Sequence, residues 1–127
     1  MKVLNFGSLN LDYVYTIEHF VQPGETLAAT SRTLKHGGKG LNQSIALARA
    51  GVSVSHAGCV GTGGSCLLDA LRENGVDTSN VIPVDEMQRH TVIQVNPDGE
   101  NCILLYGGSN RCIIRRSFSA ARARHPR

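Results

Sequence analysis

The sequence contains no run of 18 or more apolar residues, which is the length a hydrophobic helix needs to cross a membrane. Its first ten residues, MKVLNFGSLN, also lack the apolar core of a secretory signal peptide. The four cysteines follow neither a zinc-binding nor a CxxC spacing; they are Cys59, Cys66, Cys102 and Cys112. We therefore expect a cytoplasmic protein with reduced cysteines, no metal site and no membrane partner.

Acidic residues are missing from the end of the chain. Six arginines and no Asp or Glu occur from Arg111 onward, so residues 1–110 hold seven basic and ten acidic residues and carry a net charge of −3. A basic tail can bind phosphate backbones non-specifically, but RRSFSAARARHPR lacks regular aromatic interleaving. We do not expect a nucleic-acid partner. Binding through the tail would show a steep salt dependence that disappears when residues 113–127 are removed.

What is present is the composition of one globular domain. The 127 residues are 41% hydrophobic and 18% charged, which is enough for a single core. Apolar and β-branched patterns predict strands at residues 2–7, 11–20, 27–35 and 52–61, and amphipathic spacing predicts helices at 41–50 and 65–75. We expect Gly51 and Gly75 to end these helices and Ser65 to be the N-cap of the second.

The segment from Thr91 to Tyr106 has a different pattern. TVIQV and CILLY flank NPDGEN, and Asn-Pro-Asp-Gly is a strong turn signal, so the segment predicts a β-hairpin. The earlier alternation of strands and helices favours a parallel sheet with crossover helices. Together these patterns predict an α/β body with a small projecting β-sheet.

A glycine-rich segment, LKHGGKGLNQSIALARAG at residues 34–51, is the strongest local signal. It is not a Walker A loop, because Thr33 stands where the first glycine belongs and Lys39 is followed by Gly40. A dinucleotide fingerprint started at Gly61 reaches Cys66 where its last glycine belongs. Neither familiar phosphate-binding loop is therefore present.

The polar residues around this segment suit a ligand with many hydroxyl groups. Gly38 allows close backbone approach, Lys39 supplies a cation, and Asn42 offers a donor and an acceptor in the first helical turn. Asn10 and Asp12 follow the first strand and point to the same side if the chain stays extended. Sugar hydroxyls both donate and accept hydrogen bonds, so such a set fits a sugar. The alternative is that Asn10 and Asp12 cap a turn and that Lys39 is solvated.

These residues resemble the first signature of the ribokinase-like (PfkB) carbohydrate kinases. The positions at the required spacings are Gly37, Gly38, Gly40, Asn42, Ser44, Gly51 and Gly61. The opening GSLNLD, the PGET turn and the NPDGENCILLYGGSN hairpin are also similar to the N-terminal region of that family. The resemblance covers residues 1 to about 112.

The resemblance implies a function and a set of site residues. The family transfers the ATP γ-phosphate to a sugar hydroxymethyl or a related alcohol. Asn10 and Asp12 match residues that hold sugar hydroxyls, while Gly38, Lys39 and Asn42 match the segment that closes over the sugar. The implied partner is thus a small-molecule sugar, and the implied cofactors are ATP and Mg²⁺.

The implied fold is the N-terminal part of a ribokinase-like three-layer α/β/α fold with a small projecting β-sheet lid. Residues 13–18, 27–35 and 91–106 resemble that lid, which covers the site and excludes water as a competing phosphoryl acceptor. In several relatives the lid also pairs two subunits, so a homodimer through the lid strands is possible.

The sequence departs from the family in ways that limit this assignment. Gly63 stands where an acidic residue is common, and no G-A-G-D motif carries the catalytic aspartate. Family kinases are more than twice as long. We therefore assign residues 1–112 to the sugar-binding and lid portion, and expect the catalytic and ATP-binding half to be absent.

Residues 113–127 form a tail unlike the rest of the chain. A shifted reading frame or a truncated gene model would produce such a break, and a genuine basic extension is the alternative. In either case we expect this tail to be disordered or poorly packed.

Two classes of function remain open from the sequence. One is a carbohydrate kinase whose catalysis is lost or depends on the missing half; the other is a non-enzymatic sugar-binding or lid-mediated dimerisation remnant. We expect the isolated chain to be inactive and marginally stable, because part of a parallel sheet leaves an exposed edge.

Overall fold

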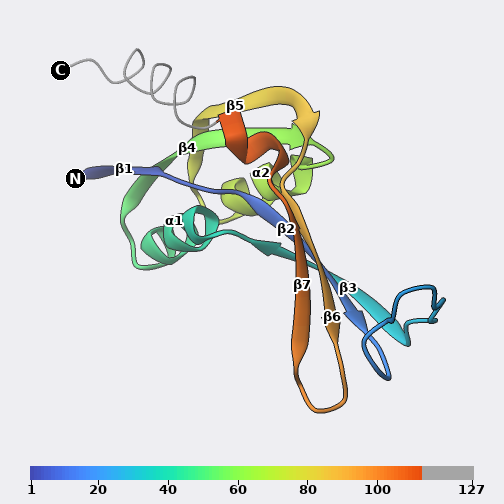
Figure 1. Ribbon diagram of the computed structural model, residues 1–127. Helices are drawn as coiled ribbons and strands as arrows, with labels where there is room; N and C mark the ends of the chain where they lie inside the picture. Colours follow the sequence, from blue (N-terminus) through green and yellow to red (C-terminus); the bar gives the residue numbers. More distant parts are fainter. Residues whose placement is uncertain (113–127) are drawn as a thin grey trace.

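The computed structural model describes the backbone of residues 1–112 and the side chains of residues 1–110 (Figure 1). In chain order the elements are β1 (Lys2–Phe6), β2 (Asn10–Thr16), β3 (Ser31–Gly37), α1 (Lys39–Arg49), β4 (Ser53–Thr62), α2 (Ser65–Glu73), β5 (Asp77–Met87), β6 (His90–Val95), β7 (Asn101–Tyr106) and the 3₁₀ helix η1 (Gly108–Cys112). The prediction for the tail at residues 113–127 lies outside the described residues.

The body of the protein is a three-stranded parallel sheet, here called the core sheet, with the order β1-β4-β5. The chain enters β4 from α1 and passes from β4 to β5 through α2, so helices make the crossovers that parallel pairing requires. This arrangement confirms the α/β pattern predicted from the alternation of strands and helices.

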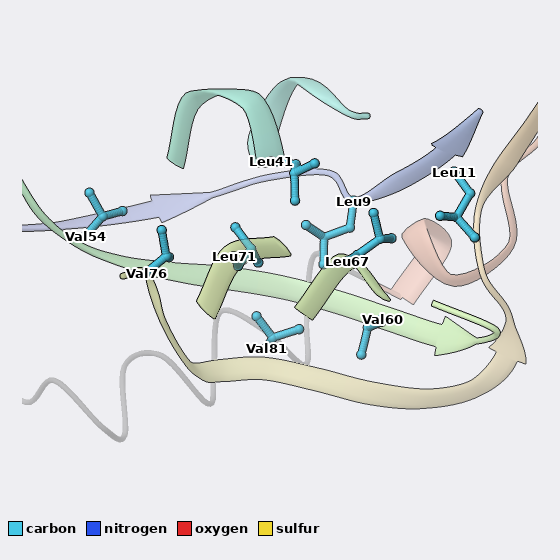
Figure 2. Packing of buried hydrophobic residues seen from close by; sticks show 9 residues of the cluster. All are labelled: Leu9, Leu11, Leu41, Val54, Val60, Leu67, Leu71, Val76 and Val81. Atoms are coloured by element: carbon cyan, nitrogen blue, oxygen red, sulfur yellow. The ribbon is translucent and has the colours of Figure 1, made fainter. Parts of the chain in front are cut away.

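One cluster of buried apolar side chains joins the helices to the core sheet (Figure 2). Leu41 comes from α1, Leu67 and Leu71 from α2, and Val54 and Val60 from β4. Leu9, in the segment between β1 and β2, is fully buried in the same cluster. The cluster therefore fixes both helices relative to the segment that leads into β2.

The second sheet, here called the projecting sheet, extends away from this body with the order β3-β2-β6-β7 (Figure 1). β2 pairs antiparallel with β3 and parallel with β6, and β6 pairs antiparallel with β7. The β6–β7 turn has Gly99 at φ 80°, and the Asn96 side chain accepts hydrogen bonds from the backbone N–H groups of Asp98 and Glu100. The predicted hairpin and the small projecting sheet are both present.

Several details differ from the sequence predictions. β2 ends at Thr16, so residues 17–20 of the strand predicted at 11–20 lie outside it, and α1 begins two residues earlier than predicted, at Lys39. β5 was not predicted, because its sequence contains Pro83 and several polar residues; Pro is tolerated there since β5 lies at an edge of the core sheet. Ser65 is the first residue of α2 rather than its N-cap: Gly64 holds the cap position, and no side chain caps the helix. β3 begins only at Ser31, so residues 27–30 are not part of it.

Two further findings concern the cysteines and the helices of the described residues. Cys59, Cys66 and Cys102 form no disulfide. Within residues 1–112, none of the helices has both the length and the apolar character that a membrane crossing requires.

Replacing Leu67 by Ala tests the packing of the core. Leu67 is fully buried, so Leu67→Ala should lower the free energy of unfolding by about 2–5 kcal/mol, measured by urea denaturation. Leu4→Ala is the matched control, because Leu4 is 45% exposed on β1, outside the projecting sheet, and the same truncation there should cost about 1 kcal/mol or less. Equal losses for the two variants would contradict the described core.

Candidate functional site

Asp12 lies at the joint between the two sheets, near the start of β2. One of its carboxylate oxygens, Oδ1, accepts a hydrogen bond from Asn10 Nδ2 at 2.5 Å and a second from the Thr91 hydroxyl on β6. The other oxygen, Oδ2, has no hydrogen-bond partner in the described part of the chain and faces the backbone of Gly37. Its two neighbours thus fix the orientation of Asp12 and leave one oxygen available to a ligand.

Asn10 adds a second acceptor that lacks a partner. The residue is only 4% exposed, and its Oδ1 atom receives no hydrogen bond from the described residues. Nearly all buried polar atoms in native proteins are hydrogen-bonded, so an orphaned amide oxygen calls for a donor from outside. Because Asn10 also donates to Asp12, the two residues form one unit, in which the buried amide oxygen of Asn10 lacks a donor among the described residues.

The glycine loop, residues 37–42, packs directly on the backbone at the end of β1. A Cβ atom on Gly40 would lie 2.4 Å from Ser8 N and from the carbonyl carbon of Gly7, so only glycine fits there. Gly38 has φ 100°, and a Cβ atom on it would lie 2.6 Å from the carbonyl oxygen of Ser8. Ser8 is two residues before Asn10, so this contact brings the loop to the edge where the acceptors lie.

Lys39 and Asn42 lie in the first turn of α1. Both side chains are exposed, and the structure gives neither of them a hydrogen bond or an ion pair with another described residue. The first turn also lacks an acidic residue and a capping side chain, so its positive dipole end is not neutralised locally. The structure thus places two hydrogen-bond donors at the beginning of α1, directly after Gly37 and Gly38.

The five predicted site residues are therefore brought together to different degrees. Asn10 and Asp12 touch each other, which confirms that they point to the same side, and the loop backbone at Gly37 lies against them. Lys39 and Asn42 lie at the beginning of the helix that follows, and the structure gives their side chains no hydrogen bond to Asn10 or Asp12. The roles of all five as sugar contacts stay a prediction.

A groove of about 630 Å³ lies on the opposite face of the projecting sheet. Leu11, Tyr13 and Tyr15 line it, and these residues alternate along β2 with Asn10 and Asp12. None of the five predicted site residues lines this groove. The predicted site therefore lies on the other face of the sheet, outside this groove, and is here called the shelf.

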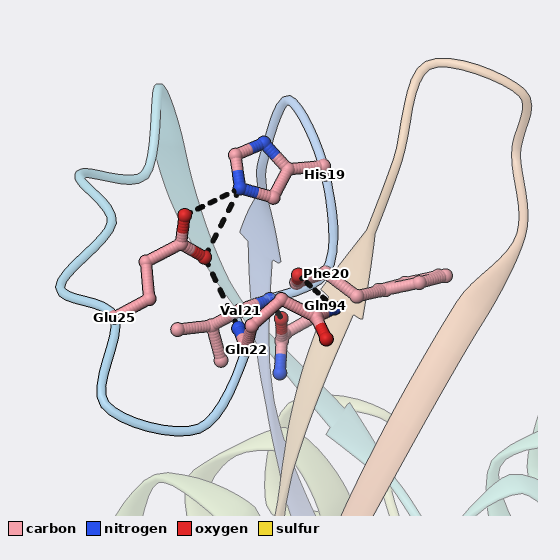
Figure 3. A network of polar contacts seen from close by, with 6 residues as sticks. All are labelled: His19, Phe20, Val21, Gln22, Glu25 and Gln94. Carbon is pink, nitrogen blue, oxygen red and sulfur yellow. Dashed lines mark hydrogen bonds and ion pairs between the residues drawn. The ribbon is translucent and has the colours of Figure 1, made fainter.

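A short loop closes the far end of the projecting sheet (Figure 3). His19 Nε2 lies 3.0 and 2.8 Å from the two carboxylate oxygens of Glu25, and this contact, with help from the Gln22 backbone N–H, lowers the pKa of Glu25. The Gln94 side chain on β6 accepts a hydrogen bond from Val21 N at 3.1 Å. The loop is thus folded on itself and attached to β6, although exposed pairs of this kind contribute little stability.

Sequence reasoning missed two groups of polar residues. Thr91 lies opposite Asp12 in the pairing of β2 with β6, so only knowledge of that register could have found it. His56 and Ser44, both fully buried, interact beneath the glycine loop. A histidine inside the otherwise uncharged strand SVSHAGCVGT was the one signal the sequence offered.

The fold is that of an α/β protein in which the polar side chains of Asn10, Asp12 and Thr91 meet at the joint between its two sheets. Residues 1–123 match the family described as pfkB family carbohydrate kinase, and the chain belongs to that family. Ribokinase from Haemophilus influenzae is 38% identical over 107 residues, which are 82% of this chain and 35% of the relative. Ribokinase from Bacillus subtilis is 38% identical over 106 residues, 82% of this chain and 36% of the relative. The chain thus spans about a third of the length of the curated relatives it matches.

Solved structures agree with this assignment. Ribokinase from Cryptococcus neoformans, in complex with ADP, superposes with a TM-score of 0.80 at 41% identity, over 85% of this chain and 35% of that one. Ribokinase from Arabidopsis thaliana, complexed with ribose and ATP, gives a TM-score of 0.79 at 32% identity, over 86% and 36%. The prediction of the N-terminal part of a ribokinase-like α/β fold is confirmed.

Replacing Gly40 by Ala tests the close backbone contact under the site. Its Cβ atom would overlap the Gly7–Ser8 backbone, so Gly40→Ala should destabilise the fold by about 2–4 kcal/mol in urea denaturation. Gly51→Ala is the control: Gly51 has φ 89° but open space around it, so strain alone should cost about 1–2 kcal/mol. A Gly40→Ala variant as stable as the parent chain would rule out the contact.

Proposed function

We propose that this chain provides the sugar-binding and lid portion of an ATP-dependent carbohydrate kinase, which transfers a phosphoryl group to a sugar hydroxymethyl or a related alcohol. The observation that carries the proposal is the Asp12–Asn10 unit at the edge of the glycine loop: among residues 1–110, Asn10 Oδ1 receives no hydrogen bond and only Oδ1 of the Asp12 carboxylate is given one. Family membership supports it, as does the ribose bound by the Arabidopsis thaliana ribokinase.

The chemistry of the shelf matches a polyhydroxyl ligand. Asp12 Oδ2 and Asn10 Oδ1 are acceptors for sugar O–H groups, and a carboxylate acceptor gives a stronger hydrogen bond than a neutral one. The Lys39 ammonium, the Asn42 amide and the backbone of the glycine loop supply donors for the sugar oxygens. Because each hydroxyl both donates and accepts, a shelf that offers both kinds of group holds a sugar in one orientation.

We propose no cofactor site among the described residues. Residues 1–112 contain no cluster of three His, Cys, Asp or Glu side chains able to hold a metal ion such as Mg²⁺. Their glycine segment also departs from the Walker A and dinucleotide patterns. We therefore assign no phosphoryl-transfer step to these residues. We expect the purified chain to bind sugar without turnover. Its location in the cytoplasm stays a prediction.

The Asp12→Asn variant tests sugar binding. Loss of the carboxylate charge should weaken the binding of ribose by about tenfold or more in isothermal titration calorimetry, since hydrogen bonds to charged groups contribute about 1.5–3 kcal/mol. Asp69→Asn on the exposed face of α2 should leave the affinity unchanged. Equal affinity of the Asp12→Asn and parent chains would overturn the assignment, whereas ATP-dependent phosphorylation by the parent chain would overturn only the expected inactivity.

A second function, pairing of two copies through the projecting sheet, is favoured by one observation. Every residue of β7, the outermost strand, is exposed, and four of its six residues are large apolar ones: Ile103, Leu104, Leu105 and Tyr106. An exposed apolar edge strand is a template for association with another chain. We propose that two copies cover this strand in a homodimer.

Sedimentation velocity of the parent chain and two variants tests this pairing. The double variant Ile103→Lys/Leu105→Lys should shift a dimer to a monomer, because both side chains lie on one face of β7 and charges resist burial. Asn101→Lys is the matched control, since it adds a charge on the same face and strand without removing an apolar group. A parent chain that stays monomeric at every concentration tested would contradict the proposal.

A further inference from the structure

The imidazole of His56 is fully buried beneath the glycine loop, and its hydrogen bonds define its tautomer. Nε2 lies 3.1 Å from the carbonyl oxygen of Gly7, which can only accept, so Nε2 carries the proton and donates. In the neutral ring Nδ1 is then an acceptor, and it takes the hydroxyl proton of Ser44 at 2.7 Å. Each bond thus determines the direction of the next.

The same chain of hydrogen bonds continues into the glycine loop. With its proton directed to His56, Ser44 Oγ accepts a hydrogen bond from Asn5 Nδ2 at 2.9 Å. Asn5 Nδ2 also donates to the carbonyl oxygen of Gly40, again at 2.9 Å. The three side chains come from β1, α1 and β4. Together they link the carbonyl oxygen of Gly7 to the carbonyl oxygen of Gly40, on the two sides of the close backbone contact.

From this geometry we propose that the Asn5–Ser44–His56 chain is the positioning element of the sugar-binding loop, and that it holds Lys39 and Asn42 in place only while His56 is neutral. The inference rests on the proposed sugar-binding function and adds a regulation to it. The three residues touch no ligand and act through the Gly40 carbonyl.

Protonation of His56 would reverse the donor and acceptor roles in its hydrogen bond with Ser44. Nδ1 would become a donor, so the Ser44 hydroxyl could no longer donate to it and would need another acceptor. The nearest backbone acceptor for a helical serine is the carbonyl four residues earlier, which here is that of Gly40. Ser44 would then compete with Asn5 for the oxygen that anchors the loop. A charge on His56 would thus change the hydrogen bonds of the Gly40 carbonyl oxygen, next to Lys39 in the glycine loop.

Within the described residues, no charged side chain contacts the imidazole. The groups that contact it are the Ser44 hydroxyl and the Gly7 carbonyl, and Gly58 lies beside it on β4. β4 itself carries no Asp, Glu, Lys or Arg. None of the charged residues of the elements packed against β4 is buried: Lys2 on β1, Lys39 and Arg49 on α1, Asp69, Arg72 and Glu73 on α2, and Asp77, Asp85 and Glu86 on β5.

Burial lowers the pKa of His56 below its ordinary value of 6.5, and the Gly7 carbonyl opposes part of this shift. Below about pH 6.5 the unfolded chain therefore binds a proton at this position that the folded chain does not. Stability should fall as the pH drops from 6.5 toward the lowered pKa, and it should not depend on His56 above 6.5. Loop order and sugar affinity should fall around the lowered pKa itself, because that is where the folded chain takes up the proton.

A titration of the full 127-residue chain by ¹H–¹⁵N NMR, from about pH 8 to pH 5 without sugar, tests the positioning directly. The His56 ring should be the Nε2–H tautomer at high pH, and the amide signals of Gly38, Lys39 and Gly40 should shift with the midpoint of His56. His56→Gln keeps one donor and one acceptor but cannot titrate, so it should remove that midpoint from the loop amides. His36→Gln, at an exposed histidine next to the loop, is the control and should leave the midpoint in place.

Ribose binding by the same variants separates positioning from a purely structural role. The affinity of the parent chain should fall about fivefold or more between pH 7.5 and a pH about one unit below the lowered pKa, and His56→Gln should bind at both pH values as the parent does at high pH. Two results would overturn the proposal: loop amide signals that do not shift as His56 titrates, or a His56→Gln variant whose ribose affinity has the same pH dependence as that of the parent chain. A chain that binds no ribose, but whose loop amides follow His56, would support the positioning and contradict only the proposed ligand.

Discussion

The fold around the site depends on the contact between two stretches of backbone, at residues 7–8 and 38–40. Neither Gly7 nor Gly40 tolerates a Cβ atom, because each would overlap the backbone of the other stretch. Leu41 N donates to the carbonyl oxygen of Ser8 at 3.0 Å, so the contact also provides a partner for one of the first N–H groups of α1. As a result, the end of β1, the beginning of β2 and the beginning of α1 meet in one place, and the polar residues on all three become neighbours.

The joint between the two sheets is held by a buried amide. Gln88, only 1% exposed, donates from Nε2 to the carbonyl oxygen of Leu9 at 2.8 Å and accepts from Gly61 N at 2.8 Å. It therefore links the entry to β6 with the entry to β2 and the end of β4. This link places Thr91 opposite Asp12, so the orientation of the carboxylate depends on the packing of the joint as much as on β2 itself.

Much of this arrangement was predictable from the sequence, and the rest was not, for physical reasons. Strand and helix patterns in the sequence predicted the α/β body and the hairpin. The glycine-rich segment and the GSLNLD segment, which resemble those of the family, predicted the glycine loop and the Asn10–Asp12 pair. β5 was missed because its polar residues and Pro83 resemble a loop until its place at the sheet edge is known. Thr91, Asn5, Ser44 and His56 were missed because their partners lie 12 to 79 residues away along the chain, and only the packed structure shows them together.

An NMR titration of the full chain with ribose would test the central claim most directly, which is that the glycine loop and the Asp12–Asn10 unit form one sugar-binding shelf. The account predicts that the amide signals of residues 10–12 and 37–42 shift together with a single dissociation constant. It also predicts that the signals around Tyr13, Tyr15 and His90, which line the groove on the opposite face, stay in place. Shifts confined to that groove, or no shifts in the loop at saturating ribose, would contradict it.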